Sequence, residues 1–168
     1  MFHGEVQSQN NCGRLTHDLL AEYSSRMDSE EHFRTMLIME QKRAQRYNTP
    51  CMLMLIDAAL LFQCRKFRKI FRKLMSAIDE STRETDIKGW YDINRIIGII
   101  FTEFEINTIE LIVNKVTASL AEAIPGDLSL VQVSYLIFPE DQKQGDFIAS
   151  LEDDEAPRPK QSALVCAQ

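Results

Sequence analysis

The stretch that decides the fold, residues 86–102, reads DIKGWYDINRIIGIIFT. Its second half is rich in isoleucine, and such a run of β-branched residues is typical of a central strand. Its first half is short and partly aromatic, and only a few polar residues separate the two halves. We therefore predict two neighbouring strands, over Asp86–Tyr91 and Arg95–Thr102, joined by a tight connection.

Helices and strands alternate on both sides of this pair of strands. Cys51–Asp57 is a short apolar run after a proline, which predicts a buried strand. Apolar residues recur every three or four positions over Phe67–Ile78 and Ile109–Leu120, which predicts two amphipathic helices. A last strand is expected over Leu128–Phe138. The order predicts an α+β fold with a βαββαβ core and an antiparallel sheet of the ferredoxin-like type.

A further helix is expected ahead of this core. Asp28 and Glu31 fit a capping box, which marks a helix start. Pro50 disfavours helical geometry in the residue before it and so ends the helix. Between them lies a mostly apolar stripe at helical spacing, formed by Phe33, Met36, Leu37, Glu40, Ala44 and Tyr47.

The composition indicates one globular domain. The chain has 168 residues and a net charge of −6, which argues against wholesale nucleic-acid binding. It shows neither a signal peptide nor an uncharged apolar stretch of the roughly 20 residues that a membrane-spanning helix needs. We expect a soluble, cytoplasmic protein with a flexible segment 1–27, a folded domain 28–141 and an acidic, disordered tail 142–168.

Metal and cofactor sites are not indicated. The four cysteines form no CxxC pair, and the three histidines are scattered. Cys51 and Cys64 stand among apolar residues, so buried free thiols are expected.

Four motifs together resemble a known family. Phe33–Asp57 combines a helix containing Arg and Ala with a strand that ends in Asp57, and Arg83–Asp86 reads RETD. Residues 92–96 read DINRI, and the last strand is followed by Pro139-Glu140-Asp141. In this order and spacing, residues 30–141 resemble a GGDEF (diguanylate cyclase) domain. The resemblance implies that family's nucleotide-cyclase-type fold.

The signature itself departs from the family pattern. Where the family has Gly-Gly-Asp/Glu-Glu-Phe, this chain has Asp92, Ile93, Asn94, Arg95 and Ile96. Side chains replace the glycines that let substrate phosphates approach, and an amide and a cation replace the metal-binding acids. Asp57 remains as one carboxylate, and the family's base-binding loop has no counterpart after it. The resemblance therefore implies a degenerate GGDEF domain that is not an enzyme, with no metal and no cofactor.

Arg83 and Asp86 form an RxxD motif. In the family this motif belongs to an inhibitory site that binds cyclic di-GMP. A second arginine usually completes that site, and in this chain Lys115 stands near its position. A guanidinium can donate a fork of hydrogen bonds to the O6/N7 edge of guanine, and a carboxylate can accept from its N–H groups. The alternative is that Arg83 and Asp86 cap the preceding helix and pair locally in a turn.

A dense basic run spans Arg65–Lys73, with six cations in nine residues. It could meet phosphates, an anionic membrane surface or a protein partner, or it could be a solvated helix face. Another alternative is that the acidic tail folds back onto it. Trp90 and Tyr91 could stack on a purine, although aromatic residues in such positions more often pack a strand against a helix.

Three functions remain open at this point. The first is a non-catalytic cyclic di-GMP receptor that uses Arg83, Asp86 and Lys115. The family resemblance suggests control of exopolysaccharide production or another surface process as its output. The second is a ligand-free interaction module that dimerises or docks on a partner through residues 65–73 or the tail. The third is an enzyme of another kind on the same fold.

Overall fold

The computed structural model describes residues 27–139, which form an antiparallel sheet with helices on both faces. The strands are β1 (Cys51–Asp57), β2 (Ile87–Asp92), β3 (Ile96–Phe101) and β4 (Gln132–Phe138), in the spatial order β2-β3-β1-β4. The helices are α2 (Glu30–Tyr47), α3 (Phe67–Ser81) and α4 (Ile109–Ala123), with short 3-10 turns at Leu61–Gln63, Ile106–Thr108 and Leu128–Leu130. The predicted α+β class and the βαββαβ order are confirmed.

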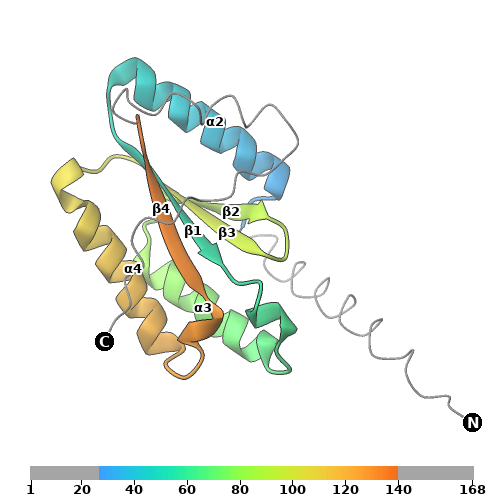
Figure 1. Ribbon diagram of the computed structural model, residues 1–168. Coiled ribbons are helices and arrows are strands. Elements are labelled where there is room, and N and C mark those ends of the chain that lie inside the picture. Colours follow the sequence, from blue (N-terminus) through green and yellow to red (C-terminus); the bar gives the residue numbers. More distant parts are fainter. Residues whose placement is uncertain (1–26, 140–168) are drawn as a thin grey trace, which may run out of the picture.

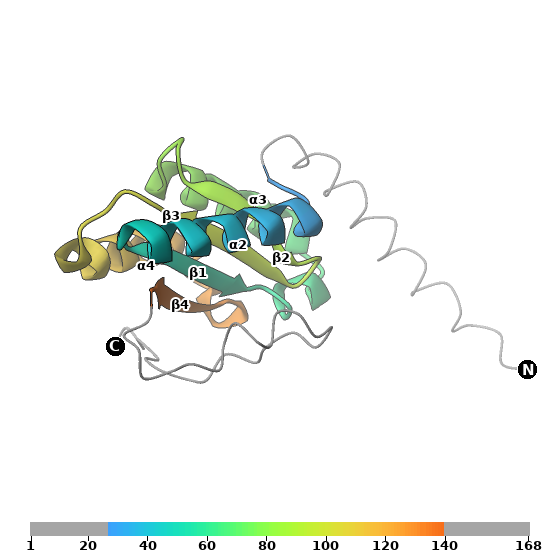
Figure 2. The same ribbon diagram turned by 90° about the horizontal axis from the view of Figure 1, so that it is seen from above.

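The helices divide the core into two layers. Figure 1 shows α2 on one side of the sheet and α3 with α4 on the other, and the view from above in Figure 2 shows α2 lying along its own face. The central strand β1 pairs with β3 and β4 and is buried from Cys51 to Ile56. Such two-sided burial explains why its sequence is continuously apolar rather than alternating.

A pair of glycines lets α2 lie close to the sheet. Gly89 of β2 faces Gly98 of β3, and the ring of Phe33 from α2 packs directly on both. A Cβ atom at Gly98 would lie 2.4 Å from this ring, and one at Gly89 would lie 2.7 Å from it. Phe33 is fully buried as a result.

The start of α2 differs from the expected capping box at Asp28 and Glu31. Ser29 is the N-cap, and its hydroxyl accepts from the backbone N–H of His32 at 3.3 Å. Asp28 instead continues the sheet: its N–H donates to Lys88, and its carbonyl accepts from the N–H of Trp90. At the other end of the helix, Tyr47 is exposed and lies outside the buried stripe.

The last strand is shorter than expected. The backbone of Leu128–Leu130 forms a 3-10 turn, with the N–H of Val131 donating to Leu128, and the strand begins at Gln132. Of the segments expected to be flexible or disordered, 1–26 and 142–168 lie outside the described residues, while Met27 is buried against the core. Glu140 and Asp141, expected within the domain, also lie outside them.

The two described cysteines differ in environment. Cys51 is buried at the start of β1, where burial, with a smaller contribution from the charge of Glu40, raises the pKa of its thiol to about 12. Cys64 is only half-buried, contrary to expectation, because it follows the Leu61–Gln63 turn at the edge of the core. No helix within residues 27–139 is long and apolar enough to cross a membrane.

Candidate functional site

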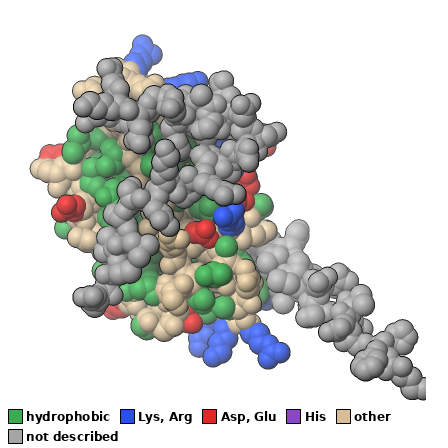
Figure 3. Space-filling model, in the orientation of Figure 1, with side chains coloured by type: hydrophobic (Ala, Val, Ile, Leu, Met, Phe, Trp, Pro, Cys, Tyr) green, Lys and Arg blue, Asp and Glu red, His purple; other side chains and the backbone are tan. Residues whose placement is uncertain are grey.

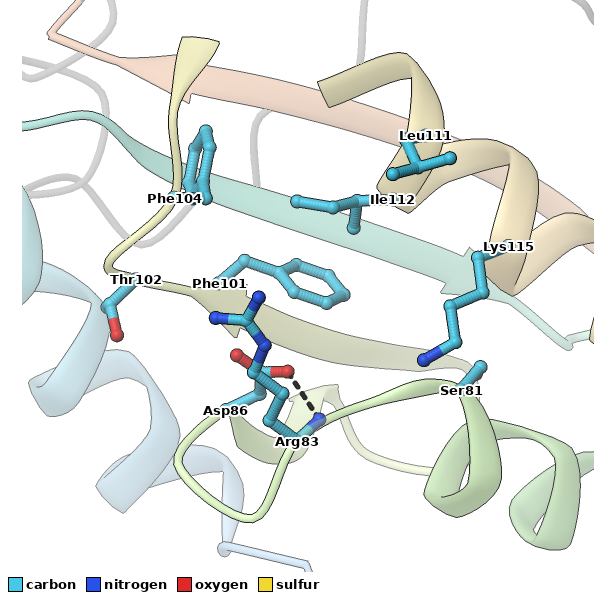
Figure 4. Close-up of a pocket in the computed structure, with 9 residues that line it drawn as sticks. All are labelled: Ser81, Arg83, Asp86, Phe101, Thr102, Phe104, Leu111, Ile112 and Lys115. Atoms are coloured by element: carbon cyan, nitrogen blue, oxygen red, sulfur yellow. Dashed lines mark hydrogen bonds between the residues drawn. The ribbon is translucent and has the colours of Figure 1, made fainter. Parts of the chain in front are cut away.

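A cavity of about 250 Å³ gathers the residues of the predicted binding site. Arg83 and Asp86 reach it from the turn between α3 and β2, and Lys115 reaches it from α4. Figure 4 shows Arg83 and Lys115 approaching the cavity from opposite sides. Positions separated by about 30 residues in the sequence therefore meet at one place.

The RETD motif folds as a tight turn. The backbone N–H of Arg83 donates to Oδ2 of Asp86 at 2.7 Å, and the N–H of Asp86 donates to the carbonyl of Arg83 at 3.2 Å. The expected local turn is therefore present. It uses the backbone of Arg83 and leaves the exposed guanidinium with no hydrogen bond or ion pair to any residue in the range 27–139. The turn and a binding role for the guanidinium are compatible.

Asp86 is the buried acid of the cavity, with a relative exposure of 6%. Its burial raises the pKa of the carboxyl group above the ordinary value. The Arg83 N–H and then the charges of Arg83, Lys88 and Lys115 act in the opposite direction. The cavity thus contains a hydrogen-bond acceptor at its base and two cations, Arg83 and Lys115, at its rim.

An apolar wall completes the cavity, and the sequence analysis missed it. The wall consists of Phe101, Phe104, Leu111 and Ile112, which come from β3, the loop after it and α4. Leu111 is 69% exposed, although it is a large aliphatic side chain. An apolar wall beside a few polar groups is the usual composition of a small-molecule site and suits a flat aromatic ring. No local pattern marks these residues, because their common feature is the space they enclose.

The degenerate signature forms the tip of the β2–β3 hairpin. Asn94 adopts a left-handed conformation with φ 61°, and the N–H of Arg95 donates to the carbonyl of Asp92. The Arg95 guanidinium lies 3.6 Å from Oδ2 of Asp92 and 3.9 Å from Oδ2 of Asp57. Oδ1 of Asp57 accepts the N–H of Ala59 at 2.9 Å. The chain's own cation therefore lies beside the Asp57 carboxylate, which is the one acid that remains from the family's metal-binding set.

The first turn of α2 holds the same hairpin from the other side. Glu30 Oε2 accepts the N–H of Ile93 at 3.1 Å. Arg34 donates two hydrogen bonds to the carbonyl of Tyr91, at 3.2 and 3.3 Å, and pairs with Glu30 at 3.0 Å. No local pattern in the sequence indicates the contacts of Glu30 and Arg34 with the hairpin, since the partners stand about 60 positions apart. A carboxylate of the protein thus takes a hairpin N–H that would otherwise be free to meet an anion.

Trp90 and Tyr91 are both buried, which supports the packing role. The Trp90 ring is stacked on Phe71 of α3, with the centroids 6.1 Å apart and the planes 2° from parallel. The Tyr91 ring lies on the opposite face of the sheet, with the Arg34 guanidinium 5.4 Å from its centroid. Neither ring lines the cavity.

Metal ligands do not cluster in the described part of the chain: residues 27–139 contain no group of three or more His, Cys, Asp or Glu that could hold a metal ion. The basic run is divided between the loop after the Leu61–Gln63 turn and the first half of α3. It does not contribute to the cavity.

Comparison with known proteins supports the fold. The chain is similar to the crystal structure of a DGC (diguanylate cyclase) protein from Thermotoga maritima, with a TM-score of 0.54 and 21% sequence identity. The match covers 69% of this chain and 85% of that chain. No protein-family model matches the chain, and no curated protein matches it either. The structural likeness establishes a diguanylate-cyclase-like fold.

Proposed function

We propose that this chain is a non-catalytic regulatory protein that binds cyclic di-GMP in the cavity between the RETD turn and α4. The observation that carries the proposal is the convergence of Arg83, Asp86 and Lys115 on one cavity with an apolar wall. The resemblance to the GGDEF family implies a role in cyclic di-GMP binding for the same three residues.

Each group in the cavity has a matching group on the ligand. Asp86 can accept hydrogen bonds from the N–H groups of guanine, and the Arg83 guanidinium can donate to its O6/N7 edge. Lys115, a point charge on a flexible stem, suits a phosphate. Leu111 and Ile112 can contact the face of the base. The cavity is smaller than the range of about 300–1,000 Å³ typical of ligand pockets, so it can enclose only one guanine end of the ligand.

The hairpin supports the non-catalytic part of the proposal. A divalent cation at Asp57 would have to compete with Arg95 for the carboxylate. Substrate phosphates would have to displace Glu30 from the N–H of Ile93. Phosphoryl transfer depends on metal ions and backbone donors placed at the reacting phosphates, and here the protein's own side chains engage the corresponding groups.

Calorimetric titration of cyclic di-GMP into the wild-type chain tests the proposal, with GTP as the control ligand. Two variants accompany it: Arg83→Ala at the cavity, and Arg46→Ala as a matched exposed arginine at the far end of α2. We expect saturable binding of cyclic di-GMP by the wild type and by Arg46→Ala, and loss of binding in Arg83→Ala.

Two results would overturn the proposal. One is equal binding by Arg83→Ala and the wild type, which would place the ligand elsewhere. The other is conversion of GTP and Mg²⁺ to cyclic di-GMP by the purified protein, measured by chromatography of the nucleotides, which would show an active hairpin.

A second candidate function is a ligand-free interaction module. Ile106 and Leu111, at the start of α4, are 70% and 69% exposed, and large apolar side chains so exposed are a feature of protein interfaces. No heat with any ligand from a correctly folded protein would favour this function. Dimerisation, expected as an option from the sequence, belongs to this candidate and stays a prediction.

A further inference from the structure

The charge of this protein is unevenly distributed along the chain. Residues 140–168 carry seven acidic and three basic side chains, which gives a net charge of −4 out of the −6 of the whole chain. The densest part is the run Glu152-Asp153-Asp154-Glu155, which we call the acidic segment. Most of the net negative charge therefore lies outside the described residues.

The densest positive charge lies on α3 and the residues before it. Arg65, Lys66, Lys69 and Lys73, which we call the basic strip, are all exposed. Lys66 at the N-cap and Lys69 and Lys73 within α3 follow at steps of three and four residues, which places them on one side of the helix, away from its buried face. Arg65 directly precedes the N-cap. Figure 3 shows Lys and Arg side chains gathered at the lower edge of the molecule, where Figure 1 places α3. None of the four forms an ion pair with another residue in the range 27–139.

The basic strip is electrostatically unfavourable for the helix that carries it. The start of a helix is the positive end of its dipole and favours acids, yet the first turn of α3 contains none. Lys66 occupies the N-cap and provides no side-chain hydrogen bond there. Lys66 and Lys69, and Lys69 and Lys73, are like-charge neighbours at three and four residues, which further destabilises the helix. A bound anion would relieve both effects.

We infer that the basic strip is the docking surface for the chain's own acidic segment. The acidic segment has four carboxylates and the basic strip has four exposed cations, so their charges are complementary. Because the two segments belong to one chain, their effective concentration is high without any strong individual contact. This inference is independent of the proposed cyclic di-GMP site, since the strip lies outside the cavity.

The connecting chain is long enough to reach. Pro139 follows Phe138, which pairs with Cys51 at the start of β1, whereas α3 is entered from the far end of β1. The connection must therefore return along the seven residues of β1, about 23 Å at about 3.3 Å per residue. The thirteen steps from Pro139 to Glu152 can span about 43 Å when the chain is extended.

Zero-length carbodiimide cross-linking of the full chain tests the contact directly. Mass spectrometry would locate bonds between the carboxylates of residues 152–155 and the amines of Lys66, Lys69 and Lys73. We expect these bonds at low ionic strength and a yield about fivefold lower at 1 M salt, where the Debye length falls to about 3 Å. Lys42, exposed on α2 on the opposite side of the sheet, is the internal control and should remain unlinked.

An equal mixture of ¹⁴N- and ¹⁵N-labelled protein shows whether the acidic segment on the basic strip belongs to the same chain or to a second copy. Cross-links within one isotope class support the inference, and mixed-isotope cross-links would replace it with a contact between two copies. Cross-links spread evenly over Lys42, Lys88 and Lys115 would show non-specific attraction and overturn it. The absence of any cross-link to the strip would do the same.

Elution from immobilised heparin gives a second readout, because a docked acidic segment screens the strip from other polyanions. Neutralising the segment (E152Q, D153N, D154N, E155Q) should raise the salt concentration needed for elution. The matched control removes four exposed carboxylates near α4 (E103Q, E105Q, E110Q, E122Q) and should raise it less. Equal shifts in the two variants would mean that net charge alone matters and would count against docking.

Discussion

The hairpin tip and the cavity contain similar charged residues, which differ in how far they are paired with other groups of the protein. At the hairpin, Arg95 lies between Asp57 and Asp92, and the N–H of Ile93 donates to Glu30. At the cavity, the Asp86 carboxylate accepts one backbone N–H, and the guanidinium of Arg83 has no partner among the described residues. Both regions combine carboxylates with an arginine, but only the arginine of the cavity has a guanidinium without a partner among residues 27–139.

The difference shows where a ligand can gain free energy. A ligand at the hairpin must replace contacts that the protein already makes, so its net gain is small. A ligand at the cavity meets cations at the rim and an acid whose burial has already taken it out of water. The pairing of polar side chains thus distinguishes the region in which we propose that a ligand binds from the region in which we propose that none does.

The largest expected effect is on the affinity for cyclic di-GMP, and it should differ between variants of Arg83 and Arg95. Arg83→Ala should weaken cyclic di-GMP binding by about 10- to 100-fold, because a charge-assisted hydrogen bond contributes about 1.5–3 kcal/mol. Arg95→Ala should leave the affinity unchanged. Its own ion pairs are largely exposed, so its removal should cost at most about 1 kcal/mol of unfolding free energy. Titration calorimetry and urea denaturation measure the two quantities, and an affinity loss in Arg95→Ala would reverse the comparison.

The packing beneath the hairpin is expected to be intolerant of added volume. Gly98→Ala brings a methyl group into the Phe33 ring and should lower the unfolding free energy by about 1–3 kcal/mol. Gly126→Ala is the matched control, since a Cβ atom there meets nothing within 4 Å. Urea denaturation of both variants checks this, and similar stabilities would show that α2 can move away from the sheet at little cost.

Removing the contacts between Arg34 of α2 and the hairpin is expected to have a smaller effect on stability. Arg34→Ala removes two hydrogen bonds to the carbonyl of Tyr91 and the pair with Glu30. Because these groups are partly exposed, we expect a loss of about 1–2 kcal/mol in unfolding free energy. The guanidinium of Arg46 contacts the exposed ring of Tyr47 and has no other partner within residues 27–139, so Arg46→Ala should have almost no effect by the same measurement. Equal losses of unfolding free energy in the two variants would mean that the contacts of Arg34 do not stabilise the hairpin.

The smallest effect concerns the titration of Asp86. Its pKa is raised in the folded protein, so folding favours the protonated form. The stability that this contributes is fully present below the unfolded-state pKa and is lost as the pH rises through the folded-state pKa. The stability of the wild type relative to Asp86→Asn should therefore fall across that window, in denaturation at a series of pH values.

The same titration should strengthen ligand binding. An ionised carboxylate offers only acceptors to the guanine N–H groups, whereas a protonated carboxyl group carries an O–H donor on one of its oxygens. The affinity for cyclic di-GMP should therefore rise as the pH rises through the raised pKa of Asp86. Binding that is independent of pH in this range would remove Asp86 from the ligand's contacts.

The sequence predicted the elements well where local periodicity determines them. The isoleucine-rich run of β3 and the amphipathic spacing of α3 were each recognised from their own residues. The start of α2 was misplaced by one residue because Asp28, a good capping residue, is instead bonded to the edge of β2. A local motif cannot reveal that a tertiary contact competes for the same residue.

The candidate site was predicted only in part for a similar reason. Arg83 and Asp86 are close in sequence and form a recognisable motif, and Lys115 was predicted because it stands near the position of a second arginine in the family that the chain resembles. The wall of Phe101, Phe104, Leu111 and Ile112 depends on how α4 lies against β3. The fit of Phe33 to Gly89 and Gly98 likewise depends on the crossing of a helix over two strands. Both are properties of the assembled layers rather than of any segment.

The contact of Phe33 with the two glycines also constrains how this sequence can diverge. A side chain at position 98 becomes acceptable only if position 33 becomes smaller, so neither position can change far by itself. Related chains should therefore show correlated substitutions at positions 33, 89 and 98. Alignment of such relatives would locate the crossing of α2 over the sheet from covariation alone, even where the cavity and the hairpin have changed beyond recognition.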